Sequence, residues 1–112
     1  MEERVSRKPV EVSDEFKVSR TYIYDYSFDV FGQIQAERYL QKIENALNSL
    51  PCFYMAYPEC RHLATKSRMY RNIILDAHLI IYRITNERIE VLDVIHSASS
   101  IGKIRGARKI HL

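Results

Sequence analysis

Arginine and histidine side chains in the second half of the chain have the chemistry to hold an anion or move a proton. Arg68 and Arg71 stand at the start of a strand-like run, where a guanidinium can hold a phosphate or a carboxylate in bidentate geometry. His96 ends a later run, and an imidazole titrating at about pH 6.5 can serve as base or acid. Each has a structural alternative: an arginine can pair with Glu90 or Asp93 of a neighbouring strand, and a histidine at a strand end often makes a structural hydrogen bond.

Other residue types in this half give weaker signals. Tyr82 can stack on a base or pack into a partner, although aromatic residues in central strands more often belong to the core. Arg83 beside it is more often a surface ion-pair partner than a binding residue. His62, His78 and His111 lack metal-ligand spacing, so we expect no metal and no cofactor. The sequence has no P-loop, HEXXH, G-x-S-x-G or dinucleotide glycine pattern, which argues against the corresponding enzyme classes.

Charge is distributed unevenly along the chain. Residues 1–59 contain seven Lys/Arg and ten Asp/Glu, whereas residues 60–112 contain ten Lys/Arg and four Asp/Glu. No side-chain carboxylate follows Asp93, and a short basic stretch comes after it. Such a patch attracts nucleic acid or an acidic protein segment without choosing between them, and a solvated tail is an equal alternative. The basic residues concerned are Lys103, Arg105, Arg108 and Lys109.

The first half predicts a short strand followed by two helices. Residues 9–12 alternate like a strand, and Ser13 or Asp14 can cap a helix that begins near Glu15. Gly32 offers the left-handed conformation that ends a helix, and Pro51 is expected to stop the second one. Helical spacing predicts the buried side of each helix. For the first helix it comprises Phe16, Ile23, Tyr26 and Val30, and for the second Ala36, Tyr39, Leu40, Ile43, Leu47 and Leu50.

Three strand-like runs in the second half predict an antiparallel meander. They cover residues 69–75, 78–84 and 88–96, and the connections between them are too short for parallel crossovers. The expected fold is therefore α+β, with an N-terminal strand, a two-helix hairpin packed on a three- to four-stranded antiparallel meander, and a short basic C-terminal tail. We expect the second face of this sheet to meet a partner. If the chain's own helices covered both faces, the functional assignment made below would fail.

Length and cysteine usage set the broad class. The 112 residues fit one domain, residues 1–112, and 46% hydrophobic residues are enough to build a core. Cys52 and Cys60 match neither a redox pair nor a zinc knuckle, which indicates two free thiols in a reducing compartment. No apolar run is long enough to cross a bilayer and no secretory signal is evident, so a cytoplasmic protein without membrane partners is expected.

Several blocks of the sequence resemble the RelE/ParE toxin superfamily, and the ParE branch in particular. Residues 23–26, followed by Phe31-Gly32, Ala36 and Tyr39, are similar to the I-x-x-Y and F-G-x-x-x-A-x-x-Y patterns of the helical hairpin. Leu50-Pro51, Tyr70-Arg71, the run at 78–84 and Val94-Ile95-His96 resemble the family's later blocks in the same order. The resemblance covers about residues 8 to 97, and the order and spacing of the blocks carry it.

The resemblance implies a toxin of a type II toxin–antitoxin system, of the plasmid stabilisation type. Such a toxin is neutralised by a cognate antitoxin protein, with which it can form a higher-order complex. ParE-type members inhibit DNA gyrase, and RelE-type members cleave mRNA on the ribosome. The remaining alternative is a non-toxic interaction module with the same fold.

RelE-type cleavage requires cationic side chains and acid–base residues at the site of reaction, and the sequence supplies only some of them. Arg71 falls where a sheet lysine would be, but Ile73 and Leu79 occupy two other cationic positions, and no tyrosine follows Tyr82. We therefore expect a ParE-like toxin that binds gyrase rather than an enzyme, with a metal-independent endoribonuclease using Arg68, Arg71 and His96 as the rival. Target or antitoxin contacts are expected from Arg68, Arg71, Tyr82, Arg83, His96, Lys103, Arg105 and Arg108.

Overall fold

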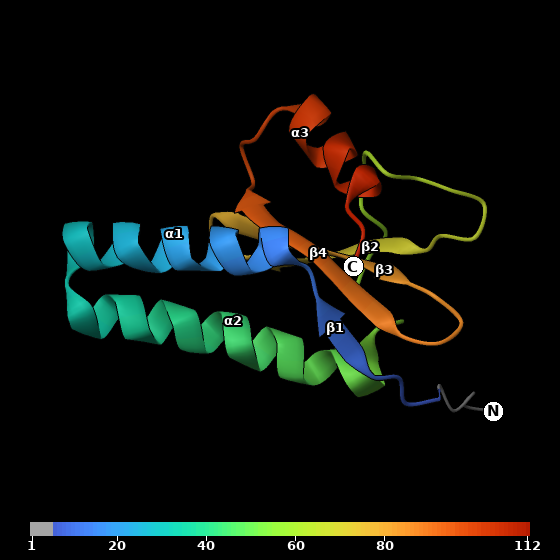
Figure 1. The fold of residues 1–112 in the computed structure, drawn as a ribbon, viewed down its shortest axis with the longest axis horizontal. Coiled ribbons are helices and arrows are strands. Elements are labelled where there is room, and N and C mark those ends of the chain that lie inside the picture. The colour runs from blue at the N-terminus through green and yellow to red at the C-terminus, as the bar shows by residue number, and fades with distance from the viewer. Residues whose placement is uncertain (1–5) are drawn as a thin grey trace.

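Two long helices and a four-stranded sheet form most of the protein (Figure 1). The computed structural model describes residues 6–112. Its helices are α1 (Asp14–Phe31), α2 (Gln33–Phe53), the short α3 (Ile101–Gly106) and a 3-10 turn, η1 (Ala107–Lys109). Its strands are β1 (Val10–Val12), β2 (Tyr70–Leu75), β3 (His78–Ile84) and β4 (Ile89–His96). The predicted α+β class is confirmed, and none of the helices within residues 6–112 combines the length and apolar character needed to span a bilayer.

The sheet has the order β1-β4-β3-β2. Strands β2, β3 and β4 pair antiparallel through short turns, which confirms the predicted meander. The first strand joins the other edge in parallel, with Val10 opposite Ile89, so the sheet is mixed and not wholly antiparallel as expected. Parallel pairing is available because the helical hairpin and the meander together form a long connection between β1 and β4.

The helical hairpin begins and turns where the sequence indicates, but it ends later. The Ser13 hydroxyl accepts a hydrogen bond from the Phe16 amide at 2.9 Å and caps α1. Gly32, at φ +88°, separates α1 from α2. The prediction that Pro51 stops the second helix is wrong, because α2 continues to Phe53. Proline removes one helical amide bond, but burial of Leu50 and Tyr54 on either side of it holds the last turn in place.

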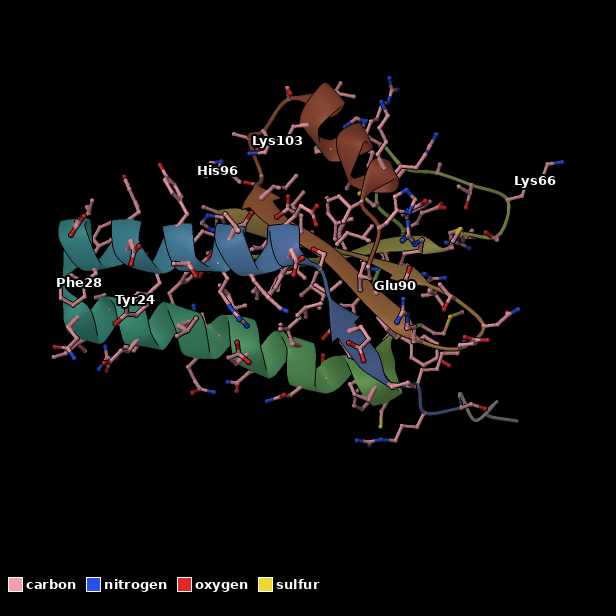
Figure 2. All side chains as sticks on the ribbon, in the orientation of Figure 1. Tyr24, Phe28, Lys66, Glu90, His96 and Lys103 are labelled. Atoms are coloured by element: carbon pink, nitrogen blue, oxygen red, sulfur yellow. The ribbon has the colours of Figure 1, made fainter. Side chains whose placement is uncertain are left out.

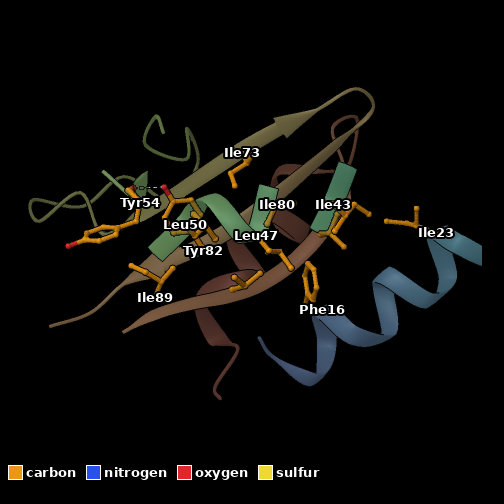
Figure 3. Packing of buried hydrophobic residues seen from close by; sticks show 12 residues of the cluster. Phe16, Ile23, Ile43, Leu47, Leu50, Tyr54, Ile73, Ile80, Tyr82 and Ile89 are labelled. Carbon is orange, nitrogen blue, oxygen red and sulfur yellow. Dashed lines mark hydrogen bonds between the residues drawn. The ribbon is translucent and has the colours of Figure 1, made fainter. Parts of the chain in front are cut away.

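The first core cluster lies between the hairpin and the sheet (Figure 3). Phe16 from α1 and Ile43, Leu47 and Leu50 from α2 pack against the strands beneath them. The predicted inward side of α1 is only half correct, because Phe16 and Ile23 are buried whereas Tyr26 and Val30 are more than half exposed. Figure 1 shows why: the far ends of α1 and α2 project beyond the sheet. The strand residues of this cluster are Ile73, Ile80, Tyr82, Ile89, Val91 and Val94.

The second face of the sheet is covered by the chain itself, so the expectation of an open face for a partner is wrong. Residues 97–112, expected as a basic tail, instead fold into α3 and η1, and Ile104 and Ala107 turn inward. Together with Cys60 and Leu63 of the connection between α2 and β2, they form a second core cluster. This cluster covers Ile81, Leu92 and Ile95 of the sheet. A partner must therefore bind elsewhere.

Candidate partner-binding groove

An open groove of about 1080 Å³ lies between the projecting hairpin and one end of the sheet. One side is the outer surface of α1, and the floor is formed by the turn between β2 and β3 and by the last residues of β4. The groove exists because the hairpin extends past the strands that cover its base (Figure 1). Its lining comprises Val18, Ser19, Tyr22, Ile23, Tyr26, Ser27, Phe31, Gln35, Tyr39, residues 76–78, residues 94–96 and Lys103.

The α1 side of the groove is an uncovered apolar stripe. Val18, Tyr22 and Tyr26 recur every four residues, so they lie on one face of the helix. Their exposed fractions are 70%, 71% and 56%. Isolated exposed apolar residues are ordinary on a protein surface, but a contiguous stripe beside a groove is typical of an interaction site.

Three neighbouring rings, Tyr39, His78 and His96, line the floor of the groove. The Tyr39 hydroxyl shares a hydrogen bond with His78 Nδ1 at 2.5 Å, and the two histidine rings meet edge to face with centroids 5.5 Å apart. Burial raises the pKa of Tyr39 to about 12, with a further contribution from the Asp76 carboxylate. Burial also lowers the pKa of His78 below its ordinary value, and His96 lowers it further, outweighing Asp76. The floor therefore favours a neutral His78 at neutral pH.

Charged groups flank the groove without filling it. Asp76 is held by an ion pair with Lys42 at 2.9 Å, and Lys103 approaches from α3. Figure 2 shows His96 and Lys103 near one another above α1, and both line the groove. The hydroxyl of Ser19, which also lines the groove, donates to the Asp93 carboxylate at 2.6 Å. Burial raises the pKa of Asp93 despite this hydrogen bond.

Three of the predicted binding residues are engaged in the fold. The Arg71 guanidinium is buried and donates to the carbonyls of Met55 and Tyr57 at 3.0 and 2.9 Å. The Tyr82 hydroxyl, also buried, donates to the Tyr54 carbonyl at 2.6 Å. Arg83 lies 2.7 Å from the Glu90 carboxylate, to which Arg88 also donates. Burial alone would raise the pKa of Glu90, but these two arginines hold it below its ordinary value.

The other predicted residues lie in three separate places. His96 and Lys103 line the groove. Arg68 stands at the opposite end of the sheet, where it lines a smaller pocket and pairs with Glu59 at 3.8 Å. Arg105 and Arg108 are exposed on α3 and η1. The structure therefore does not bring Arg68, Arg71 and His96 together as the endoribonuclease alternative requires.

The groove also contains residues that the sequence analysis did not select. Tyr22, Val18 and His78 are among them, and the four-residue spacing of Val18, Tyr22 and Tyr26 was the available signal. Within residues 6–112, no group of three or more His, Cys, Asp or Glu side chains is placed to hold a metal ion. Cys52 and Cys60 are both free thiols, as predicted.

Comparison with known proteins agrees with this fold. Residues 10–101 match the family model described as ParE toxin of type II toxin-antitoxin system, parDE. Toxin ParE1 of Mycobacterium tuberculosis, present in two strains, is 29% identical over 83 residues, which are 72% of this chain and 81% of the relative. A solved structure described as the chromosomal ParDE TA system from P. aeruginosa matches with a TM-score of 0.67 and 14% identity, over 80% of this chain and 96% of that one.

The family match spans most of the chain and does not depend on an open sheet face. Coverage of that face by α3 and η1 moves the candidate partner surface to the groove but leaves the family resemblance intact. The structural neighbour, at 14% identity, shows the fold alone. On the sequence match over residues 10–101, this chain belongs to the ParE toxin family of type II toxin–antitoxin systems.

Proposed function

We propose that this chain arrests growth by binding a macromolecular target, and that a cognate antitoxin neutralises it by inserting a segment into the groove beside α1. The observation that carries this proposal is the uncovered apolar stripe of Val18, Tyr22 and Tyr26 above a preformed groove. Leaving three large side chains in water gives up the free energy that their burial would contribute. A partner that covers the stripe recovers that free energy.

An amphipathic helix is the occupant that fits this groove best. The groove slightly exceeds the range of about 300–1,000 Å³ that is usual for small-molecule sites, and it is open along the helix rather than enclosed. In helix-in-groove recognition the incoming helix lays its apolar face, with anchors three or four residues apart, against an apolar surface such as the exposed stripe on α1. Lys103 at the rim favours an acidic residue in the incoming segment. The solved relative comes from a ParDE toxin–antitoxin system, in line with an antitoxin partner for this chain.

DNA gyrase is the target that family membership supports, with the cytoplasm as the site of action. The RelE-type alternative, cleavage of mRNA on the ribosome, needs an acid–base and cationic set around one phosphate. Arg71 already donates to two backbone carbonyls, and Arg68 and His96 lie at opposite ends of the sheet. The arrangement of these residues thus favours inhibition by binding over catalysis.

Induction of the chain in bacteria, followed by an assay on purified gyrase, tests the proposal. We expect growth arrest with filamentation, relief of the arrest when the cognate antitoxin is co-expressed, and inhibition of plasmid supercoiling by the purified chain. Cleavage of ribosome-bound mRNA in the same cells is mapped in parallel, to test the endoribonuclease alternative. Discrete cuts in those messages, with supercoiling unaffected, would contradict the choice of gyrase.

A further inference from the structure

A strongly basic surface lies on the layer that covers the second face of the sheet. This layer, here called the basic layer, consists of residues 54–69 and 101–112, held together by the second core cluster. It contains seven Lys/Arg side chains and a single carboxylate, Glu59, which pairs with Arg68 at 3.8 Å. Figure 1 shows α3 beside the long connection into β2, and Figure 2 shows Lys66 at the outer edge of that connection. The basic residues are Arg61, Lys66, Arg68, Lys103, Arg105, Arg108 and Lys109, all exposed.

The opposite side of the molecule has a different character. The helical hairpin, residues 14–53, contains six Asp/Glu and four Lys/Arg, and it holds most of the exposed large apolar side chains. The basic layer, by contrast, exposes three such side chains, Met55, Ile101 and Leu112. Two chemically distinct surfaces on one small domain suit two different partners. A partner of the basic layer would therefore differ in chemistry from the occupant of the groove.

The composition of the basic layer favours a nucleic acid over an acidic protein. Protein interfaces are built around a buried apolar or aromatic centre and are depleted of charge there. No Phe, Tyr or Trp ring is exposed within residues 54–69 and 101–112, since Tyr54 is buried and Tyr57 is half-buried, and the exposed ring there is the imidazole of His111. The lack of exposed Phe, Tyr and Trp rings also disfavours single strands, whose bases stack on aromatic side chains. The basic layer is thus mainly a dense array of cations, and such arrays commonly bind the phosphates of duplex nucleic acid.

We propose that the basic layer binds the phosphate backbone of duplex DNA without reading its sequence. Helix α3 has six residues, and its inner side is fixed to the sheet by Ile104, so it presents charged side chains without a recognition helix that could enter the major groove. Contacts of this kind position a protein on DNA and carry no sequence information. The basic layer shares only Lys103 with the antitoxin groove, and the proposal does not depend on the proposed function.

Fluorescence anisotropy with a labelled duplex of about 20 base pairs tests the proposal on the full-length chain alone. The test variant combines Arg105→Gln, Arg108→Gln and Lys109→Gln, all exposed on α3 and η1. The matched control combines Lys17→Gln, Arg38→Gln and Lys42→Gln, which remove the same charge from the hairpin. A second test variant, Arg105→Lys with Arg108→Lys, keeps the charge at the basic layer. Circular dichroism and thermal melting check that every variant is folded.

The wild-type chain should bind with an affinity that falls steeply between about 50 and 200 mM salt, and two unrelated duplexes should bind within about twofold of each other. The triple Gln variant should bind at least about tenfold more weakly at low salt, with a salt slope reduced by up to about 3, since each lost phosphate contact removes about 0.9. The hairpin control and the Lys variant should stay within about threefold of wild type.

Three results would overturn the proposal. The first is equal weakening by the basic-layer and hairpin variants, because net charge rather than this surface would then be responsible. The second is binding of the corresponding single strand as tightly as the duplex. The third is displacement of the duplex by polyglutamate at equal charge concentration, which would assign the basic layer to an acidic protein.

Discussion

The buried side chain of Arg71 stabilises the fold by donating hydrogen bonds to backbone carbonyls. Its side chain is 8% exposed, and it donates from Nη1 to the carbonyls of Met55 and Tyr57 and from Nε to the carbonyl of Arg68. These carbonyls belong to the irregular connection between α2 and β2. The guanidinium thus fixes that connection against the first strand of the meander, with charge-assisted hydrogen bonds.

We predict that Arg71→Ala lowers the free energy of unfolding by about 2–4 kcal/mol, because it leaves the carbonyls of Met55 and Tyr57 without their donor. Urea denaturation monitored by circular dichroism measures the change. Arg105→Ala is the control, since Arg105 is exposed, and it should stay within about 0.5 kcal/mol of wild type. An Arg71→Ala protein as stable as wild type that has lost growth arrest would return Arg71 to partner binding.

At the level of single residues, the sequence identified two residues of the groove but did not show which of the selected side chains are structural. His96 and Lys103 were selected from the sequence and do line the groove. Arg71 and Tyr82 were selected as well, yet both donate to carbonyls of the nearby chain. Residue type and strand position do not show whether the Arg71 or Tyr82 side chain donates to a carbonyl within the protein. Their acceptors follow α2, in a connection whose sequence has no helical or strand periodicity and whose path therefore cannot be predicted.

At the level of elements, the hairpin depends on one residue with an unusual backbone. Gly32 has φ +88° and ψ 171°, a region that residues with a side chain rarely adopt. Its amide still donates to the Phe28 carbonyl at 3.0 Å, so α1 ends and α2 begins within one residue. The sharp reversal projects both helices past the sheet as a pair and thereby creates the groove.

We predict that Gly32→Ala costs about 1–3 kcal/mol of stability, although a Cβ there would meet no atom within 4 Å. The cost is therefore one of backbone conformation alone. Gly106→Ala is the matched control, because Gly106 has equally open surroundings but lies at φ −61° in helical conformation. It should be neutral or stabilising by up to about 1 kcal/mol. Thermal and urea unfolding measure both changes, and equal effects at the two glycines would refute the argument.

The remaining elements show what periodicity can and cannot predict. The three strands of the meander were predicted almost to the residue because short turns separate the strand-like runs. The exposed side of α1 was misjudged, since the sheet ends beneath Ile23 and the helical period alone does not show how far a sheet extends. Helix α3 was taken as a tail because Ile101, Ile104 and Ala107 form too short a run to register a period.

Across the whole molecule, apolar and basic surfaces are separated onto different elements. The hairpin provides the groove and its uncovered stripe, and the basic layer provides the cations. The sheet lies between them and joins both core clusters. In this account a ParE-family toxin has one surface that its antitoxin occupies and another that remains free for a polyanion.

Affinity for the cognate antitoxin tests the central claim most directly. The groove variant combines Val18→Ala, Tyr22→Ala and Tyr26→Ala. The control combines Val30→Ala, Phe28→Ala and Phe53→Ala, which likewise removes one exposed valine and two exposed aromatic rings, all outside the groove. Isothermal titration calorimetry should show binding weakened at least about 100-fold by the groove variant, since aromatic anchors commonly contribute about 2 kcal/mol or more each. The control should bind like wild type, and equal affinity for all three proteins would contradict the account.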